Sequence, residues 1–142
     1  MTAGRVVGQT KDAGFEIGVS KTIPYAINRV WNLLTSAEGL AVWLGPGARL
    51  DLRKGSTYQT ADGTTGEVRS IHEHDRIRLT WRPSDWSHDT TVQVAIRASG
   101  DKTLLRVHQE WLADADERTR QRTHWQNVLG ALIERLESDA GR

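Results

Sequence analysis

The sequence WQNVLGALIERL at residues 125–136 decides the fold. Apolar residues recur in it at three- and four-residue intervals, which is the spacing of one face of an α-helix. The stretch belongs to a longer segment, DADERTRQRTHWQNVLGALIERLES at residues 114–138, which predicts a long C-terminal helix. The apolar face of such a helix needs a surface to pack against. The residues of this face are Trp125, Val128, Leu129, Leu132 and Leu136.

Seven upstream segments supply that surface, because each alternates apolar and polar residues as a half-buried strand does. Short turns separate the last six, which predicts an antiparallel meander. Within residues 64–72 the apolar residues Val68 and Ile71 are out of phase, and this predicts a β-bulge. The predicted strands are residues 15–23, 49–53, 56–60, 64–72, 76–81, 91–96 and 104–111.

Two short helices are predicted after the first strand. The segment 26–35 places apolar residues at helical spacing, and the segment 37–44 does the same before Gly45-Pro46-Gly47 ends it. Thr35-Ser36-Ala37-Glu38 has the form of a capping box. We expect the two helices to close one end of the sheet.

Length, charge and cysteine content narrow the class of protein. The 142 residues fit a single domain, placed at residues 14–139 after a flexible N-terminal segment, residues 1–13. With 19 basic and 18 acidic residues the net charge is +1, which gives no electrostatic basis for binding nucleic acid. The sequence has no cysteine, so disulfides and thiolate metal sites are excluded. No apolar run is long enough for membrane insertion or for a signal peptide, and we expect a cytoplasmic protein.

An ordered set of residues from 15 to 137 resembles one family, the activator-of-Hsp90-ATPase-homologue-like branch of the START/Bet v 1-like superfamily (the polyketide cyclase and lipid-transport group). The matching features are Val30-Trp31, Trp43, Asp51-Leu52-Arg53-Lys54-Gly55, Gly66, Leu79-Thr80-Trp81, Thr103 and Trp125. The resemblance implies an α+β helix-grip fold, in which a seven-stranded antiparallel sheet wraps the C-terminal helix and often leaves a cavity for an apolar ligand. Where the family commonly has Gly-Gly, this chain has Gly55-Ser56. The family has no universal catalytic set, so no catalytic residue is carried over.

Large aromatic residues and one amide are the candidate lining of such a cavity. The chain has 6 tryptophans, and several fall on the predicted inner face of the sheet or helix. For each one taken alone, a place in the solid core is favoured over a place in a pocket wall, and both interpretations stay open. Gln109 is predicted to point inward, and a buried amide needs hydrogen-bond partners. The candidate lining residues are Trp43, Tyr58, Trp81, Trp86, Gln109, Trp111 and Trp125.

Other clusters support weaker interpretations. The run His72-Glu73-His74-Asp75 is interpreted as a polar turn, because consecutive side chains at a strand end diverge and do not converge on a metal. The arginines at positions 118, 120 and 122 spread around the helix, which is typical of a solvated surface. No cofactor-binding fingerprint is present.

Three functions remain open from the sequence. The first is binding of a small apolar or aromatic ligand near Trp125, with residues 128–136 packed as solid core. The second is a cyclase- or hydrolase-type enzyme that uses the same cavity, and the third is a co-chaperone-like protein-interaction module. A homodimer is compatible with the composition.

Overall fold

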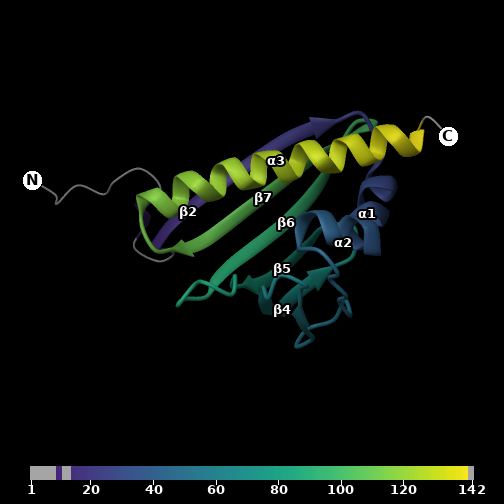
Figure 1. Cartoon of the computed structure of the whole chain (residues 1–142). Helices are drawn as coiled ribbons and strands as arrows, with labels where there is room; N and C mark the ends of the chain where they lie inside the picture. Colours follow the sequence, from purple (N-terminus) through teal and green to yellow (C-terminus); the bar gives the residue numbers. More distant parts are fainter. Residues whose placement is uncertain (1–8, 11–13, 141–142) are drawn as a thin grey trace, which may run out of the picture.

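A long helix lies across one face of a curved antiparallel sheet, with two short helices beside it (Figure 1). The computed structural model describes residues 9–10 and 14–140. The predicted flexible segment, residues 1–13, therefore lies outside the described residues except for Gln9–Thr10, which form a short strand. The elements are β1 (Gln9–Thr10), β2 (Gly14–Ile23), α1 (Ile27–Thr35), α2 (Ala37–Trp43), β3 (Thr57–Gln59), β4 (Thr65–His72), β5 (Arg76–Trp81), β6 (Thr90–Ser99), β7 (Lys102–Leu112) and α3 (Ala115–Ala140).

The sheet has seven strands in the order β1-β2-β7-β6-β5-β4-β3. Strands β3 to β7 form the predicted antiparallel meander, and β2 joins it beside β7. The bulge predicted in β4 is confirmed, because the register with β5 shifts between Val68 and Ser70. None of the described helices combines the length and the hydropathy needed to cross a bilayer.

The predicted strand at residues 49–53 is wrong. This segment is irregular, and its backbone bonds to itself: Arg53 N–H donates to the Asp51 carbonyl at 2.9 Å and Ser56 N–H to the Arg53 carbonyl at 3.2 Å. Gly55 then reverses the chain with φ +90°. Six of the seven predicted strands are therefore present, and the seventh member of the sheet is the two-residue β1.

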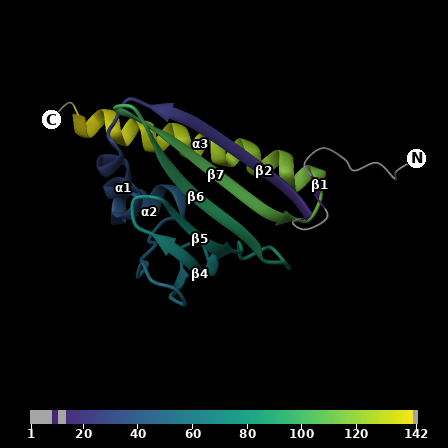
Figure 2. The ribbon, with the colours of Figure 1, turned by 180° about the vertical axis from the view of Figure 1, so that it is seen from behind.

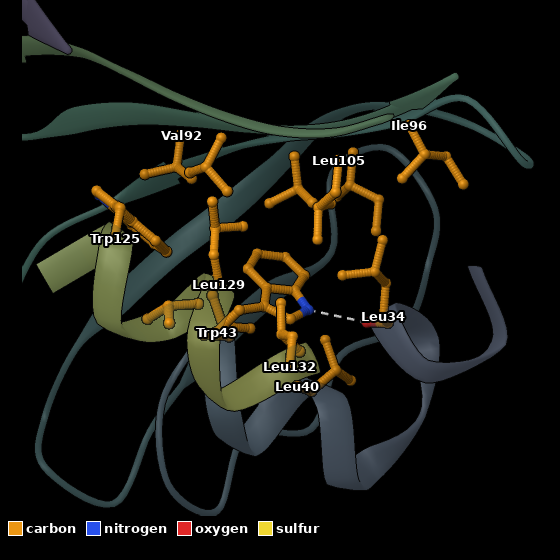
Figure 3. Packing of buried hydrophobic residues seen from close by; sticks show 14 of the residues in the cluster. Leu34, Leu40, Trp43, Val92, Ile96, Leu105, Trp125, Leu129 and Leu132 are labelled. Carbon is orange, nitrogen blue, oxygen red and sulfur yellow. Dashed lines mark hydrogen bonds between the residues drawn. The ribbon is translucent and has the colours of Figure 1, made fainter. Parts of the chain in front are cut away.

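The core lies between the sheet and α3 and is closed at one end by α1 and α2 (Figures 1 and 3). Leu132 and Leu136 of α3 are each 1% exposed, which confirms the prediction of solid core in this half of the helix. Trp43 of α2 is buried among leucines, and its Nε1–H donates to the Leu34 carbonyl at 2.9 Å (Figure 3). The indole therefore packs as core and binds α2 to α1.

The turn between α1 and α2 differs from the predicted capping box. Ser36, not Thr35, is the N-cap of α2, and its Oγ accepts from the Gly39 N–H at 3.0 Å. A Cβ on Gly39 would lie 1.8 Å from the Leu33 carbonyl oxygen, so only glycine allows this close approach of the two helices.

A second bulge interrupts β7 near its end. Ile17 pairs with Gln109 but Phe15 pairs with Leu112, so Glu110 and Trp111 together face the single residue Glu16. Trp111 has φ +68°, and the inward position passes to Leu112, which is 3% exposed. The prediction that Trp111 points inward is therefore wrong; 48% of the residue is exposed.

Candidate functional site

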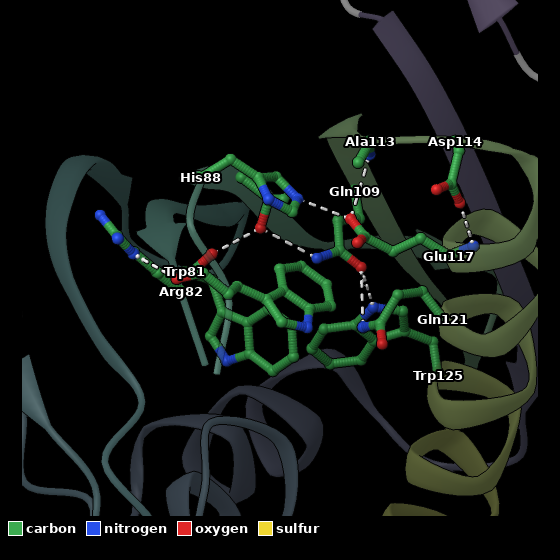
Figure 4. A network of polar contacts seen from close by, with 11 residues as sticks. Trp81, Arg82, His88, Gln109, Ala113, Asp114, Glu117, Gln121 and Trp125 are labelled. Carbon is green, nitrogen blue, oxygen red and sulfur yellow. Dashed lines mark hydrogen bonds and ion pairs between the residues drawn. The ribbon is translucent and has the colours of Figure 1, made fainter. Parts of the chain in front are cut away.

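Aromatic residues gather where the end of β5, the loop that follows it and the first half of α3 meet (Figure 4). Trp81 is at the centre. Its ring lies 5.7 Å from that of Trp125, 5.9 Å from that of His124 and 5.6 Å from that of Trp86, the last in an edge-on arrangement. Trp86 comes from the loop 82–89, and the other two partners come from α3. We call these four residues the aromatic cluster.

A buried amide lies against this cluster. Gln109 on β7 is 0% exposed, and its carbonyl oxygen accepts from Trp125 Nε1 at 2.7 Å and from Gln121 Nε2 at 3.1 Å (Figure 4). Its own NH₂ group donates to Thr90 Oγ1 at 3.0 Å, and the Thr90 hydroxyl donates onward to the Trp81 carbonyl at 2.5 Å. No buried side-chain polar atom among the described residues lacks a partner. The network therefore connects β5, β6, β7 and α3.

One hydrogen bond between side chains holds the loop 82–89 against the start of α3. His88 Nε2 lies 2.7 Å from Glu117 Oε1, and the same oxygen accepts from the Ala113 N–H at 3.1 Å. The rings of Trp86 and His88 stack at 4.9 Å with an interplanar angle of 8°. Arg82 Nε donates to the Trp86 carbonyl at 2.9 Å. These contacts keep the loop over the aromatic cluster.

Burial shifts two titratable groups near this end of the sheet. Partial burial of the His124 ring against Trp81 lowers its pKa below the ordinary 6.5, so the neutral imidazole is favoured. Burial raises the pKa of Tyr58 above its usual range, and its hydroxyl donates to the Thr80 carbonyl at 2.6 Å. Tyr58 is therefore a neutral donor that holds β3 to β5.

The structure brings together four of the seven predicted lining residues, namely Trp81, Trp86, Gln109 and Trp125. The other three lie elsewhere. Trp43 belongs to the core at the α2 end, Tyr58 is on β3 across from Gly66, and Trp111 is on the outer surface. Side chains fill the space around Gln109 and Trp125, which are both 0% exposed.

Hydrophobic periodicity did not identify the polar partners of this site. The predicted apolar face begins only at Trp125, yet Glu117 is 6% and Gln121 8% exposed. A signal was present, because these two residues precede Trp125 by eight and four positions and so share its helix face. Thr90, His88 and His124 carried no comparable pattern in the sequence.

Comparison with known proteins identifies the family. The profile described as "Activator of Hsp90 ATPase homolog 1-like protein" matches residues 24–137. No curated protein matches the sequence.

Several solved structures share the fold at low sequence identity. CalU16 from Micromonospora echinospora is 18% identical with a TM-score of 0.75, over 85% of this chain and 73% of that protein. The HSP90 activator PFC0360w from Plasmodium falciparum is 21% identical with a TM-score of 0.73, over 86% and 96% of the two chains. The Aha1 dimer from Colwellia psychrerythraea is 17% identical with a TM-score of 0.69, over 84% and 93%.

The family profile spans most of the chain, and its helix-grip fold is the one described above. The chain therefore belongs to the activator of Hsp90 ATPase homologue 1-like family, within the START/Bet v 1-like superfamily.

Proposed function

We propose that the protein binds a small aromatic or apolar molecule beneath the loop 82–89, against the aromatic cluster. The observation that carries the proposal is the combination of three tryptophans, one histidine ring and a buried amide at the end of the space between sheet and helix. Apolar walls with a few fixed polar groups are typical of small-molecule sites.

The loop is the element that would move to admit a ligand. It joins β5 to β6, and His88 and Trp86 are its attachments to the helix and to Trp81. Displacement of Trp86 would expose the edge of the Trp81 ring. A flat ligand could then contact Trp81 in place of Trp86. Gln109 would orient the ligand by exchanging one of its hydrogen bonds, because a polar ligand atom can replace Gln121 as donor.

A titration of intrinsic tryptophan fluorescence with a panel of aromatic metabolites and fatty acids tests the proposal. We expect a saturable change that Trp86→Ala weakens. Trp111→Phe is the matched control, because it alters a tryptophan on the outer surface and should leave the apparent affinity unchanged. Absence of any saturable response across the panel, or equal binding by the Trp86→Ala variant, would count against this site.

Acid–base catalysis in the same site is a second candidate. The observation in its favour is a buried carboxylate, Glu117, paired with His88 at 2.7 Å. Glu117 Oε1 also accepts the Ala113 N–H, which ties the carboxylate to the start of α3. We therefore rank catalysis below binding. Turnover of a panel compound that is lost in Glu117→Gln, with binding retained, would reverse this order.

A protein-interaction role is the third candidate, and Trp111 favours it. A tryptophan with 48% exposure on a strand bulge is an unusual surface feature. Two proteins of similar fold are described as an HSP90 activator and as a dimer. Sedimentation of the purified chain alone and with Hsp90 tests this role, and a shift that Trp111→Ser abolishes would support it.

A further inference from the structure

The free edge of β2 is separate from the proposed ligand site. β2 has ten residues, and β1 pairs only with Phe15 and Gly14 at its start. From residue 16 to residue 23, the side of β2 away from β7 faces no strand in the part of the chain that the structure describes. Figure 2 shows this edge running alongside α3. Unpaired strand edges are templates on which another extended segment can add.

One hydrogen bond shows which backbone groups point outward from this edge. Arg118 Nε of α3 donates to the Glu16 carbonyl at 2.9 Å, so this carbonyl points away from β7. Backbone groups alternate in direction along a strand, and Gly18, Ser20 and Thr22 therefore point the same way as Glu16. These three residues are exposed. Each offers one N–H and one C=O to an added strand.

A hollow lies on the helix side of the edge at Gly18 and Ser20, between β2 and α3, and measures about 430 Å³. Its lining residues on α3 are Arg122, Gln126, Leu129 and Gly130, and Lys21 of β2 adjoins them. A second hollow, of about 410 Å³, lies on the outer face over β2, β7 and β6 rather than beyond the edge, and Arg106 is among its lining residues. Side chains of an added strand project alternately to the two faces, so those on the helix side would find space in the hollow beside α3.

Positive charge lines both hollows. Lys21 and Arg122 flank the helix-side hollow, and Arg106 lies in the outer one. None of the three makes an ion pair within the described part of the chain. The nearest carboxylate on β2 is Glu16 at the start of this edge, and it lies 3.6 Å from His108. An occupant that matches this surface carries acidic side chains.

We propose that the β2 edge binds an extended acidic peptide segment of a partner protein as an added strand. Backbone hydrogen bonds to Gly18, Ser20 and Thr22 fix the peptide, and the three unpaired cations select acidic side chains. The interface is small, so the binding is weak and sensitive to salt. This inference goes beyond the small-molecule function and does not depend on it.

NMR titration of the full ¹⁵N-labelled chain tests the proposal. The probe is a capped eight-residue peptide in which Glu alternates with Val, and the control peptide has Lys in place of Glu. We expect saturable amide shifts centred on Gly18, Ser20 and Thr22 with the Glu peptide only. In the free protein, these three amides should exchange with solvent faster than those of Ile17 and Val19, which we expect to pair with β7.

Two substitutions sharpen the test. Ser20→Pro removes an outward N–H without removing a bond to β7, and we expect about tenfold weaker binding, the equivalent of one hydrogen bond. Arg122→Glu reverses one charge on the helix and does not touch the sheet, so it stays informative even if the proline variant unfolds. Lys102→Glu at the β6–β7 turn is the matched charge control and should bind as the parent protein does.

Any of three binding results would overturn the proposal: no saturable shift with the Glu peptide, equal binding of the Lys peptide, or undiminished binding by Arg122→Glu. Slow exchange of the Gly18, Ser20 and Thr22 amides in the free protein would also overturn it, because the edge would then already be paired.

Discussion

Substitution of Gln109 by Leu probes the polar network that joins the sheet to α3. The side chain is 0% exposed and makes three hydrogen bonds, to Trp125, Gln121 and Thr90. Leu has nearly the same volume, so the change removes the hydrogen bonds while the packing is largely kept. The loss in the free energy of unfolding therefore depends on whether Trp125, Gln121 and Thr90 can satisfy their polar groups without Gln109.

The three partners differ in what they lose. Trp125 is completely buried, and Gln109 is the one acceptor of its Nε1–H among residues 9–10 and 14–140, so losing this bond costs about 1–3 kcal/mol. Gln121 is 8% exposed and can turn part of its amide toward water, which costs about 1 kcal/mol. Thr90 keeps its bond to the Trp81 carbonyl and loses little. Since Leu also avoids burying an amide, the net loss in the free energy of unfolding is about 2–4 kcal/mol.

Urea unfolding measures this loss. With a slope of about 2 kcal/mol/M, the midpoint should fall by about 1–2 M. Gln93→Leu is the matched control, because Gln93 lies on the adjacent strand β6 but on the outer face. There it accepts one hydrogen bond, from Arg78 at 3.4 Å, and no other side-chain hydrogen bond of Gln93 occurs among the described residues. That variant should change the free energy of unfolding by less than about 0.5 kcal/mol.

A double-mutant cycle with Trp125→Phe isolates the main bond. Phe has no N–H to leave unpaired, so the Gln109→Leu change should cost at least about 1 kcal/mol less in the Trp125→Phe background. Additive effects of the two changes, or a loss of less than about 1 kcal/mol for Gln109→Leu alone, would refute the reasoning that this network is a single coupled unit.

Three further predictions concern stability. Leu132→Ala should lower the free energy of unfolding by about 2–5 kcal/mol in urea, because Leu132 is 1% exposed, and it should leave ligand affinity unchanged. Gly66→Ala should lower the free energy of unfolding by about 3 kcal/mol in the same assay, because the new Cβ would lie 1.9 Å from the Thr80 carbonyl oxygen. Gly130 on α3 faces open space, so Gly130→Ala should raise the free energy of unfolding by about 0.5–1 kcal/mol. Burial lowers the pKa of His124 below 6.5, so the unfolded chain binds a proton at this residue more tightly than the folded chain does. The contribution of His124 to the free energy of unfolding is therefore complete above pH 6.5 and declines as the pH falls below that value. Urea midpoints measured from about pH 7 to pH 5 should fall less steeply in His124→Gln, and an unchanged slope would contradict this.

Periodicity predicted the main elements of the fold because the core faces are strongly apolar. The helix face from Trp125 to Leu136 and the alternation in β5, β6 and β7 are all present. The segment 49–53 alternates equally well, yet it is not a strand, since its backbone groups bond within the segment and Gly55 turns it away. Alternation over five residues does not distinguish a strand from such a turn.

Trp111 shows how one extra residue changes a site prediction. Strict alternation from Leu105 places Trp111 inward, but the bulge at Glu110 and Trp111 reverses the direction of every later side chain. The left-handed backbone at Trp111 carries no sequence signature, because glycine or asparagine is the usual residue there. Sequence alone therefore assigned a surface tryptophan to the pocket wall.

The same bulge explains why the polar network lies at Gln109. Gln109 is the last inward residue of β7 before the alternation breaks, and Leu112 then ends the strand. The chain turns at once into α3, where Asp114 caps the Glu117 N–H at 2.8 Å, so that helix begins directly beside the end of β7. Gln121, four positions before Trp125, is thereby brought onto Gln109 and donates to its carbonyl oxygen. Glu117, eight positions before Trp125, bonds instead to His88 and to the Ala113 N–H. Both buried positions are polar because buried polar groups need partners. The buried face of α3 is thus apolar from Trp125 onward and polar before it. Hydrophobic periodicity cannot detect the polar part. The four-residue spacing of Glu117, Gln121 and Trp125 does indicate that these three residues share one helix face.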